Sequence, residues 1–169
     1  MIKTQGLFLY LFVCFIGISV CKVLPNQTDD TEHYSGLLDL GVSDNSMFYW
    51  LFKSKNQSAP LLVFLPGGPG CALGVEALTD VGPWLLQEDL SLQTNPYPWT
   101  NFTHMLFLEQ PIGTGFSRVH KIEDLCTGWE CYAREMYLFL IKFMEVYSEF
   151  KGREFFIVGI SYGRKFVLL

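Results

Sequence analysis

The chain contains the stretch Phe155-Phe156-Ile157-Val158-Gly159-Ile160-Ser161-Tyr162-Gly163, a short apolar run that enters a Gly-x-Ser-x-Gly motif. The run is typical of a buried strand, and the motif is typical of a sharp turn from a strand into a helix. Such a turn holds a serine clear of both elements, and its two glycines leave room where a Cβ would collide. The helix that follows offers backbone N–H groups to a developing oxyanion. Ser161 is therefore the candidate nucleophile, and a plain strand-to-loop turn is the alternative.

Two apolar runs upstream also lead into glycine-rich loops. Residues 61–65 (LLVFL) precede Pro66-Gly67-Gly68-Pro69-Gly70-Cys71, and residues 105–109 (MLFLE) precede a second loop at 110–117 (QPIGTGFS). Continuous apolar runs suit strands that are buried on both faces of a mostly parallel sheet. Adjacent glycines let a backbone approach a ligand closely, so the loop at 66–71 is a candidate source of oxyanion donors. A tight turn made only for topology is the alternative.

The rest of the chain predicts an α/β order. Residues 33–40 and 47–53 are rich in β-forming residues and read as a hairpin. Residues 74–86 predict a short helix that ends near Gly82-Pro83, followed by a polar loop to Trp99. Residues 131–150 have helical spacing with one broad apolar face, which indicates core packing rather than a cofactor pocket. Strands alternating with helices favour a mostly parallel central sheet with an N-terminal β-hairpin.

Composition excludes several classes of protein. A chain of 169 residues has room for one domain, and 50% hydrophobic residues are too many for a disordered chain. The net charge of −5 comes with no cluster of Lys and Arg, so we expect no nucleic-acid partner. His33, His104 and His120 are scattered, and no Cys/His spacing resembles a metal site. We therefore expect neither a metal nor a cofactor.

The N-terminus predicts a secretory signal peptide at residues 1–21. A short basic start is followed by an almost wholly apolar run at 7–20, with cleavage expected after Cys21. A membrane anchor is the alternative, although the run is short for a span and no second stretch could cross a bilayer. Residues 22–32 are polar and predict a flexible segment. Sequons at Asn26, Asn56 and Asn101 agree with a secreted or lysosomal/vacuolar glycoprotein, with the first two in polar loops.

The number of cysteines is odd in the expected mature chain. Cys14 and Cys21 belong to the predicted signal peptide, which leaves Cys71, Cys126 and Cys131. One thiol therefore lacks a partner within these residues.

Residues 33–169 resemble the N-terminal portion of a serine carboxypeptidase of the α/β-hydrolase superfamily (peptidase family S10). Five motifs stand in the order of that family, which makes the resemblance specific. They are residues 61–71 (LLVFLPGGPGC), Gly82-Pro83, residues 95–99 (NPYPW), residues 111–117 (PIGTGFS) and residues 159–163 (GISYG).

The resemblance implies a role for each matching residue. Ser161 would attack the last peptide carbonyl, and the N–H groups of Gly68 and Tyr162 would form the oxyanion hole. Gly67 and Asp80 would bind the free carboxylate of a peptide substrate. The resemblance implies no cofactor and, after signal cleavage, no membrane association.

The chain departs from the family pattern where the substrate carboxylate would bind. Pro66 replaces an Asn and removes an amide donor, and Ile160 replaces a Glu and cannot form a hydrogen bond. Phe64 replaces a Trp, and Asp80 stands where a longer Glu is expected. The attack machinery is thus retained, whereas the specificity site is eroded.

The residues after Ser161 include neither an Asp nor a His. In this superfamily the triad order is Ser, Asp, His, so we expect an α/β-hydrolase fold truncated just after the nucleophile turn and inactive as it stands. Cys71 resembles a cysteine whose partner lies in the family's later sequence, and residues 155–158 would become a sheet edge. The alternatives are an acyltransferase of the same family and a non-catalytic secreted remnant.

Overall fold

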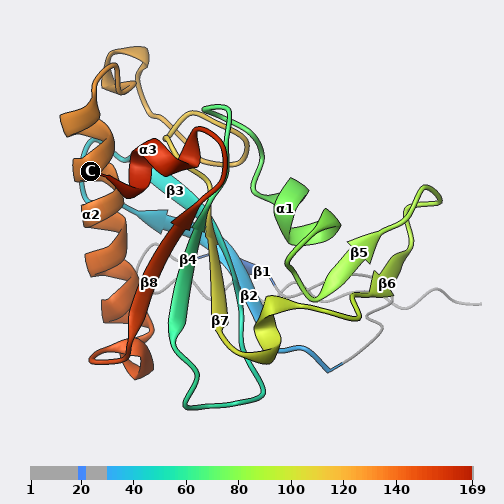
Figure 1. The fold of residues 1–169 in the computed structure, drawn as a ribbon. Coiled ribbons are helices and arrows are strands. Elements are labelled where there is room, and N and C mark those ends of the chain that lie inside the picture. The colour runs from blue at the N-terminus through green and yellow to red at the C-terminus, as the bar shows by residue number, and fades with distance from the viewer. Residues whose placement is uncertain (1–18, 22–29, 169) are drawn as a thin grey trace, which may run out of the picture.

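The computed structural model of the chain describes residues 19–21 and 30–168. A mixed six-stranded sheet forms the centre of the molecule (Figure 1). Its strands are β1 (Ser19–Cys21), β2 (His33–Asp39), β3 (Ser46–Phe52), β4 (Leu61–Leu65), β7 (His104–Leu108) and β8 (Phe155–Gly159). The other elements are α1 (Gly74–Thr79), β5 (Trp84–Leu86), β6 (Leu92–Thr94), α2 (Trp129–Val146) and α3 (Gly163–Val167). Short 3₁₀ turns stand at Trp99–Asn101, Ile122–Asp124 and Ser148–Phe150.

The strand order in the sheet is β1-β2-β3-β7-β4-β8. The strands β7, β4 and β8 are parallel neighbours, so their C-terminal ends and the loops that follow lie at one edge of the sheet. β2 and β3 form the predicted antiparallel hairpin, and β3 is antiparallel to β7. β8 lies at the outer edge beside β4, as predicted (Figure 1).

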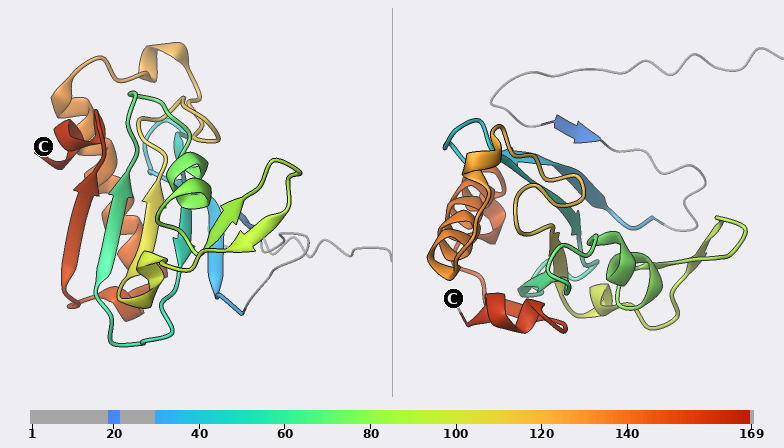
Figure 2. Two further views of the ribbon diagram at one scale, coloured as in Figure 1. Left: turned by 45° about the vertical axis from the view of Figure 1, so that its right-hand side comes forward. Right: turned by 90° about the horizontal axis from the view of Figure 1, so that it is seen from above.

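The sheet is covered on both faces. Figure 2 shows α2 on one side of the curved sheet and α1 with the β5–β6 hairpin on the other. Alternate residues of β4 divide between the two sides: Leu61, Val63 and Leu65 join the core under α2, whereas Leu62 and Phe64 join the core under α1. This burial of every β4 residue explains why the strand reads as one unbroken apolar run. The α2 face contributes its predicted apolar residues, with Met136, Phe139 and Phe143 all buried.

Two segments differ from the prediction. The helix predicted over residues 74–86 ends at Thr79, and β5 with β6 forms an antiparallel pair where a helix end and a polar loop were expected. The buried side chain of Asn95 holds the chain in a turn between α1 and β5, because its Nδ2 donates to the carbonyls of Asp80 and Gly82 at 2.8 Å each. The second helix ends at Val146 rather than at 150, because Tyr147 (φ −108°, ψ 65°) leaves helical geometry before the 3₁₀ turn.

Most of the predicted signal peptide lies outside the described residues. Its last three residues form β1, which pairs with β2 and was not predicted, so cleavage after Cys21 would leave β2 at that edge of the sheet. Glu32, at the end of the segment predicted to be flexible, forms an ion pair with Lys53 at 3.2 Å. Among the described residues, none of the helices has the length and apolar character needed to cross a membrane.

Candidate active site

Ser161 stands at the tip of a strained turn between β8 and α3. Its φ is +52°, a left-handed conformation that a residue with a side chain adopts only when its surroundings impose it, and the residue is exposed. A Cβ on Gly159 would lie 2.3 Å from the carbonyl oxygen of Gly163, and a Cβ on Gly163 would lie 2.3 Å from that of Leu65. Both positions therefore admit only glycine, as the Gly-x-Ser-x-Gly motif predicts.

The loop after β4 lies against this turn. The amide of Ile160 donates to the carbonyl of Leu65 at 3.2 Å. A Cβ on Gly67 would lie 2.9 Å from the Cβ of Ser161 and 3.4 Å from its Oγ. The parallel pairing of β4 with β8, in which Leu65 is opposite Gly159, brings the two segments together. The absence of a side chain at Gly67 is thus what allows the loop to approach the serine so closely.

The two amides predicted to form an oxyanion hole belong to these same segments. Gly68 follows Gly67 with φ +109°, and Tyr162 follows Ser161 at the start of α3. Within residues 19–21 and 30–168, neither amide donates to an acceptor of the protein. Unpaired backbone N–H groups beside an exposed serine hydroxyl are the donors that oxyanion stabilisation requires.

An aromatic contact that the sequence did not suggest supports Tyr162. Its ring stacks on that of Trp129, the first residue of α2, with centroids 6.0 Å apart. The Nζ of Lys165 lies 4.6 Å from the Tyr162 ring centroid, within the range of a cation–π contact. α2 therefore contacts the residue that follows Ser161, the candidate nucleophile.

The second glycine-rich loop, residues 110–117, encloses a buried carboxylate rather than approaching Ser161. Glu109 is fully buried, and its Oε1 and Oε2 accept the amides of Leu73 (3.3 Å) and Phe116 (2.5 Å). A Cβ on Gly115 would lie 2.2 Å from the Glu109 carboxyl carbon. Glu109 thus joins the segment that follows the first loop to the second loop. Sequence reasoning took Glu109 only as the end of a strand.

The described histidines lie away from the serine. His33 and His104 are the first residues of β2 and β7, at the N-terminal edge of the parallel strands, whereas Ser161 follows the C-terminal end of β8. His104 is buried, and that burial is the main cause that lowers its pKa. His120 donates its amide to Asn45 beyond the β3 side of the sheet, and three strand spacings of about 4.8 Å separate β3 from β8. None of the three is placed to act as the base for Ser161.

Asp80 lies at the C-terminal end of α1 and is exposed, and its described contacts are with Glu76 and Asn95. Glu76 stands one helical turn earlier, and its Oε2 is buried without a partner among the described residues. Burial is the main cause that raises the pKa of Glu76, and the charge of Asp80 raises it further. The end of α1 therefore carries one exposed carboxylate and one carboxyl group that keeps its proton to a higher pH.

Comparison with known proteins identifies the family. Residues 25–167 match the family described as serine carboxypeptidase. The chain belongs to the serine carboxypeptidase family. It is 38% identical over 154 residues to Serine carboxypeptidase-like 26 of Arabidopsis thaliana, a match that covers 85% of this chain and 34% of that protein. It is 32% identical over 154 residues to Probable serine carboxypeptidase CPVL of Homo sapiens, covering 89% and 32%.

A solved carboxypeptidase shows the same fold. The crystal structure of Kex1(delta)p, a prohormone-processing carboxypeptidase from Saccharomyces cerevisiae, matches with a TM-score of 0.70 and 28% identity, covering 76% of this chain and 31% of that one. The α/β-hydrolase fold predicted from the sequence is thus confirmed. The chain spans about a third of the length of these relatives.

Two residues at which the sequence departs from the expected family pattern lie next to Gly67 and Ser161. Pro66 is buried and immediately precedes Gly67, and Ile160 immediately precedes Ser161 with 42% of its surface exposed. A proline has no N–H and no side-chain donor, and an isoleucine offers only apolar surface. The neighbourhood of Ser161 is therefore poor in side-chain hydrogen-bond donors at these two positions.

Glycosylation at the three sequons remains a prediction. Asn26 lies outside the described residues, and Asn56 and Asn101 are exposed. Thr103, the hydroxyl residue of the third sequon, is buried and donates to the carbonyl of Trp99 at 3.1 Å.

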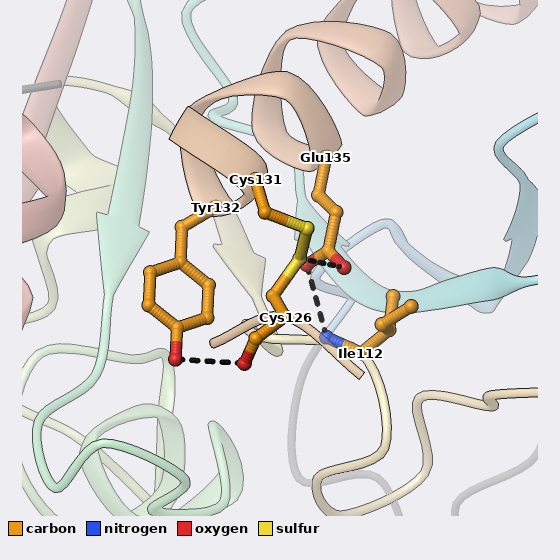
Figure 3. Close-up of a disulfide and its surroundings, with 5 residues drawn as sticks. All are labelled: Ile112, Cys126, Cys131, Tyr132 and Glu135. Atoms are coloured by element: carbon orange, nitrogen blue, oxygen red, sulfur yellow. Dashed lines mark hydrogen bonds between the residues drawn. A yellow bond between two sulfur atoms is a disulfide. The ribbon is translucent and has the colours of Figure 1, made fainter. Parts of the chain in front are cut away.

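The three cysteines beyond residue 21 divide into a pair and a single thiol. Cys126 and Cys131 form a disulfide beside Glu135 (Figure 3). Cys71 is free and exposed. The two sulfurs are bonded to each other, so they are not available as metal ligands in this state. The odd cysteine expected from the count is Cys71.

Proposed function

We propose that this chain supplies the nucleophile-bearing part of a serine-type carboxypeptidase that enters the secretory pathway. The observation that carries the proposal is the left-handed Ser161 held against Gly67, each of which is followed by a residue, Tyr162 or Gly68, whose amide has no acceptor among the described residues. A side chain at Gly67 would collide with Ser161. A side chain at Gly159 or Gly163 would collide with the backbone.

The chemistry follows from these positions. Ser161 Oγ attacks the carbonyl carbon of the last peptide bond, and the Gly68 and Tyr162 amides stabilise the oxyanion that forms. A histidine, oriented by a carboxylate, must accept the serine proton and return it to the departing amino acid. Water then hydrolyses the acyl-enzyme and regenerates the hydroxyl. Because none of the described histidines lies beside Ser161, the base must come from other residues.

Recognition of the C-terminal carboxylate is assigned to the Gly67 amide and to Asp80, which can donate a hydrogen bond to it only while the Asp80 carboxyl group holds a proton. Glu76, whose pKa burial raises, can donate a hydrogen bond to an anion while it keeps its proton. Pro66 and Ile160 contribute no donor, so we expect weak discrimination between peptides with a free and with an amidated C-terminus.

The test uses the protein expressed from its complete coding sequence. We expect release of the C-terminal residue from N-blocked dipeptides and labelling by a fluorophosphonate, both lost in Ser161→Ala. Release that persists in Ser161→Ala would contradict the assignment of the nucleophile. The polypeptide of residues 1–169 alone is expected to label no faster than its own Ser161→Ala variant, because serine without its base keeps its proton. If the protein from the complete coding sequence also labelled no faster than its Ser161→Ala variant, it would be a non-catalytic remnant.

An acyltransferase is the second candidate, and the donor-poor surface at Pro66 and Ile160 is the observation that favours it. The two functions separate when an activated ester is supplied with and without a hydroxyl-bearing acceptor. A peptidase releases free acid in both cases, whereas an acyltransferase transfers the acyl group and leaves peptides with a free C-terminus intact.

Entry into the secretory pathway has its own test. We expect the protein secreted from a eukaryotic host to start near residue 22 and to carry glycan at Asn26 or Asn56. An intact Met1, or a product without glycan, would contradict this part of the proposal.

A further inference from the structure

A buried carboxyl group lies against one sulfur of the disulfide (Figure 3). Glu135 is 6% exposed, and its Oε2 accepts the amide of Ile112 at 3.3 Å. Its Oε1 lies 2.7 Å from the Sγ of Cys126. A disulfide sulfur carries no proton, so this contact is a hydrogen bond only when Glu135 supplies the proton. Burial, partly opposed by the Ile112 amide, raises the pKa of Glu135 to about 7, so the carboxyl group holds that proton in mildly acidic solution.

The two sulfurs differ in their surroundings. Cys126 faces Glu135, whereas Cys131 borders a cavity that Cys126 does not line. Cys131 also lines a cavity of about 280 Å³, together with the apolar side chains of Leu40, Val42 and Ile112. A small molecule can therefore reach Cys131, while Cys126 has a proton donor already in place.

We propose that Cys126–Cys131 is an exchangeable disulfide that reacts with small thiols, with Cys131 as the sulfur attacked and Glu135 as the acid that protonates Cys126. A thiolate RS⁻ bonds to the Cys131 sulfur, and the bond between the two cysteine sulfurs breaks. Its electron pair leaves on Cys126, which takes the proton from Glu135 Oε1. The products are a mixed disulfide R–S–S–Cys131, a neutral Cys126 thiol and the Glu135 carboxylate. A second thiol completes the reduction and leaves as the oxidised disulfide R–S–S–R.

The reaction changes a loop beside the candidate nucleophile. The disulfide closes the segment 126–131, which contains Trp129, and Trp129 stacks on Tyr162. Opening the disulfide removes the covalent constraint on the residue that contacts Tyr162. The exchange itself needs no hydrolase activity, so its test is independent of the function proposed above.

The charges around Glu135 define the conditions for the test. On α2 its neighbour Arg134 lines the same cavity, and the 3₁₀ turn contributes Glu123 and Asp124. The hairpin contributes the neutral Asn45 to that cavity. Because Glu123 and Asp124 line the cavity, the probe is 2-mercaptoethanol, which carries no charge apart from its thiolate. Cys71→Ser in the folded protein removes the free thiol among the cysteines beyond residue 21, and it serves as the parent for every variant.

The measurement is the initial rate of disulfide opening from pH 5 to pH 9, divided by the concentration of thiolate at each pH. We expect a constant value below about pH 7 and a decline of about tenfold per pH unit above it, as Glu135 loses the proton that the leaving sulfur needs. Glu135→Gln keeps the size of the side chain but has no acidic proton. It is expected to give a lower value that does not change with pH.

Glu130→Gln is the matched control, because Glu130 is an exposed carboxylate in the first turn of the same helix. This variant is expected to retain the pH profile of the parent. Rapid alkylation and peptide mapping should place 2-mercaptoethanol on Cys131 and the alkyl group on Cys126. A parent profile without the decline above pH 7, or adducts on Cys126 instead, would overturn the proposal even if Glu135→Gln failed to fold.

Discussion

Two glycine-rich loops follow neighbouring parallel strands, yet they serve different purposes. The loop after β4 is held by backbone contacts with the turn at Ser161, and Gly67 leaves room for the serine side chain. The loop after β7 folds around the Glu109 carboxylate, and Gly115 leaves room for that carboxylate instead. The same residue type thus opens space for a candidate nucleophile in one loop and for an internal anchor in the other.

The difference teaches that the second loop supports the first. Glu109 accepts the amide of Leu73, just beyond the first loop, and the amide of Phe116 in the second. Ser117 closes the second loop by donating to the carbonyl of Glu109 at 2.6 Å and accepting the amide of Phe48 at 2.8 Å. Breaking the first loop should therefore affect Ser161 directly, and breaking the second should affect stability first.

The largest effect is expected from Gly163→Ala. The new Cβ would lie 2.3 Å from the carbonyl oxygen of Leu65 and 2.8 Å from that of Pro66, and both are backbone atoms that cannot move aside. We expect a loss of more than about 4 kcal/mol in the free energy of unfolding, or no folded protein. Thermal or urea unfolding measures it, with Gly128→Ala as the control, because a Cβ at Gly128 meets nothing within 4 Å. Equal stability of the two variants would disprove the tight contact between α3 and β4.

The second effect is expected from Glu109→Ala, which removes the acceptor of two amides. A buried amide left without a partner costs about 1–3 kcal/mol, and the Phe116 amide is only partly buried, so the loss should lie in the lower half of about 2–6 kcal/mol. Glu109→Gln keeps one acceptor oxygen and should lose about half as much. Urea unfolding measures the free energy of unfolding of both variants, provided that its dependence on denaturant concentration is unchanged. A Glu109→Ala variant as stable as the parent would show that the carboxylate does not anchor the loops.

A smaller effect on stability, but a direct one on the serine, is expected from Gly67→Ala. Its Cβ would lie 2.9 Å from the Ser161 Cβ, which rotation of the serine side chain cannot move, so the backbone of the loop or of the turn must shift. We expect about 1–2 kcal/mol of destabilisation. In the carboxypeptidase proposed above, fluorophosphonate labelling should slow by about 10-fold or more, because the serine and the proposed oxyanion donor at Gly68 are displaced together. Labelling at the normal rate would separate this loop from the chemistry.

The sequence predicted β4, β7, β8 and the Ser161 turn well because each leaves a recognisable pattern in consecutive residues. β4 and β7 are apolar at nearly every position since both faces are covered, and the glycines of the Ser161 turn are required by contacts only a few residues away or in the next strand. The adjacency of Gly67 and Ser161 follows from the parallel pairing of β4 with β8. The catalytic and substrate-binding roles stay predictions.

The parts that were missed depend on distant partners. Glu109 reads as a polar strand end, and its burial is explained by two amides outside the strand, one of which, that of Leu73, is 36 residues away in the sequence. β5 and β6 have three residues each, too few to show a period, and the burial of Trp84 in the core under α1 anchors them. The contact between Glu135 and Cys126 likewise forms only when α2 packs against the loop that precedes it. Patterns along the chain carry no record of such pairings.

The smallest effect concerns the contact between the two loops. Thr114 donates its hydroxyl to the carbonyl of Pro111 at 2.6 Å, and its methyl group faces Gly70, where a Cβ would lie 3.3 Å away. Thr114→Ala removes the partly buried hydrogen bond and should cost about 0.5–1.5 kcal/mol in unfolding free energy. Thr114→Ser keeps the hydroxyl and removes only the methyl group, so its stability should stay within about 0.5 kcal/mol of the parent.

If the second loop supports the first through the Thr114 methyl group, Thr114→Ser should increase the accessibility of the exposed Cys71 to a thiol-reactive probe, because Cys71 directly follows Gly70. Equal rates of Cys71 modification in the parent and in Thr114→Ser would show that Glu109 alone joins the two loops.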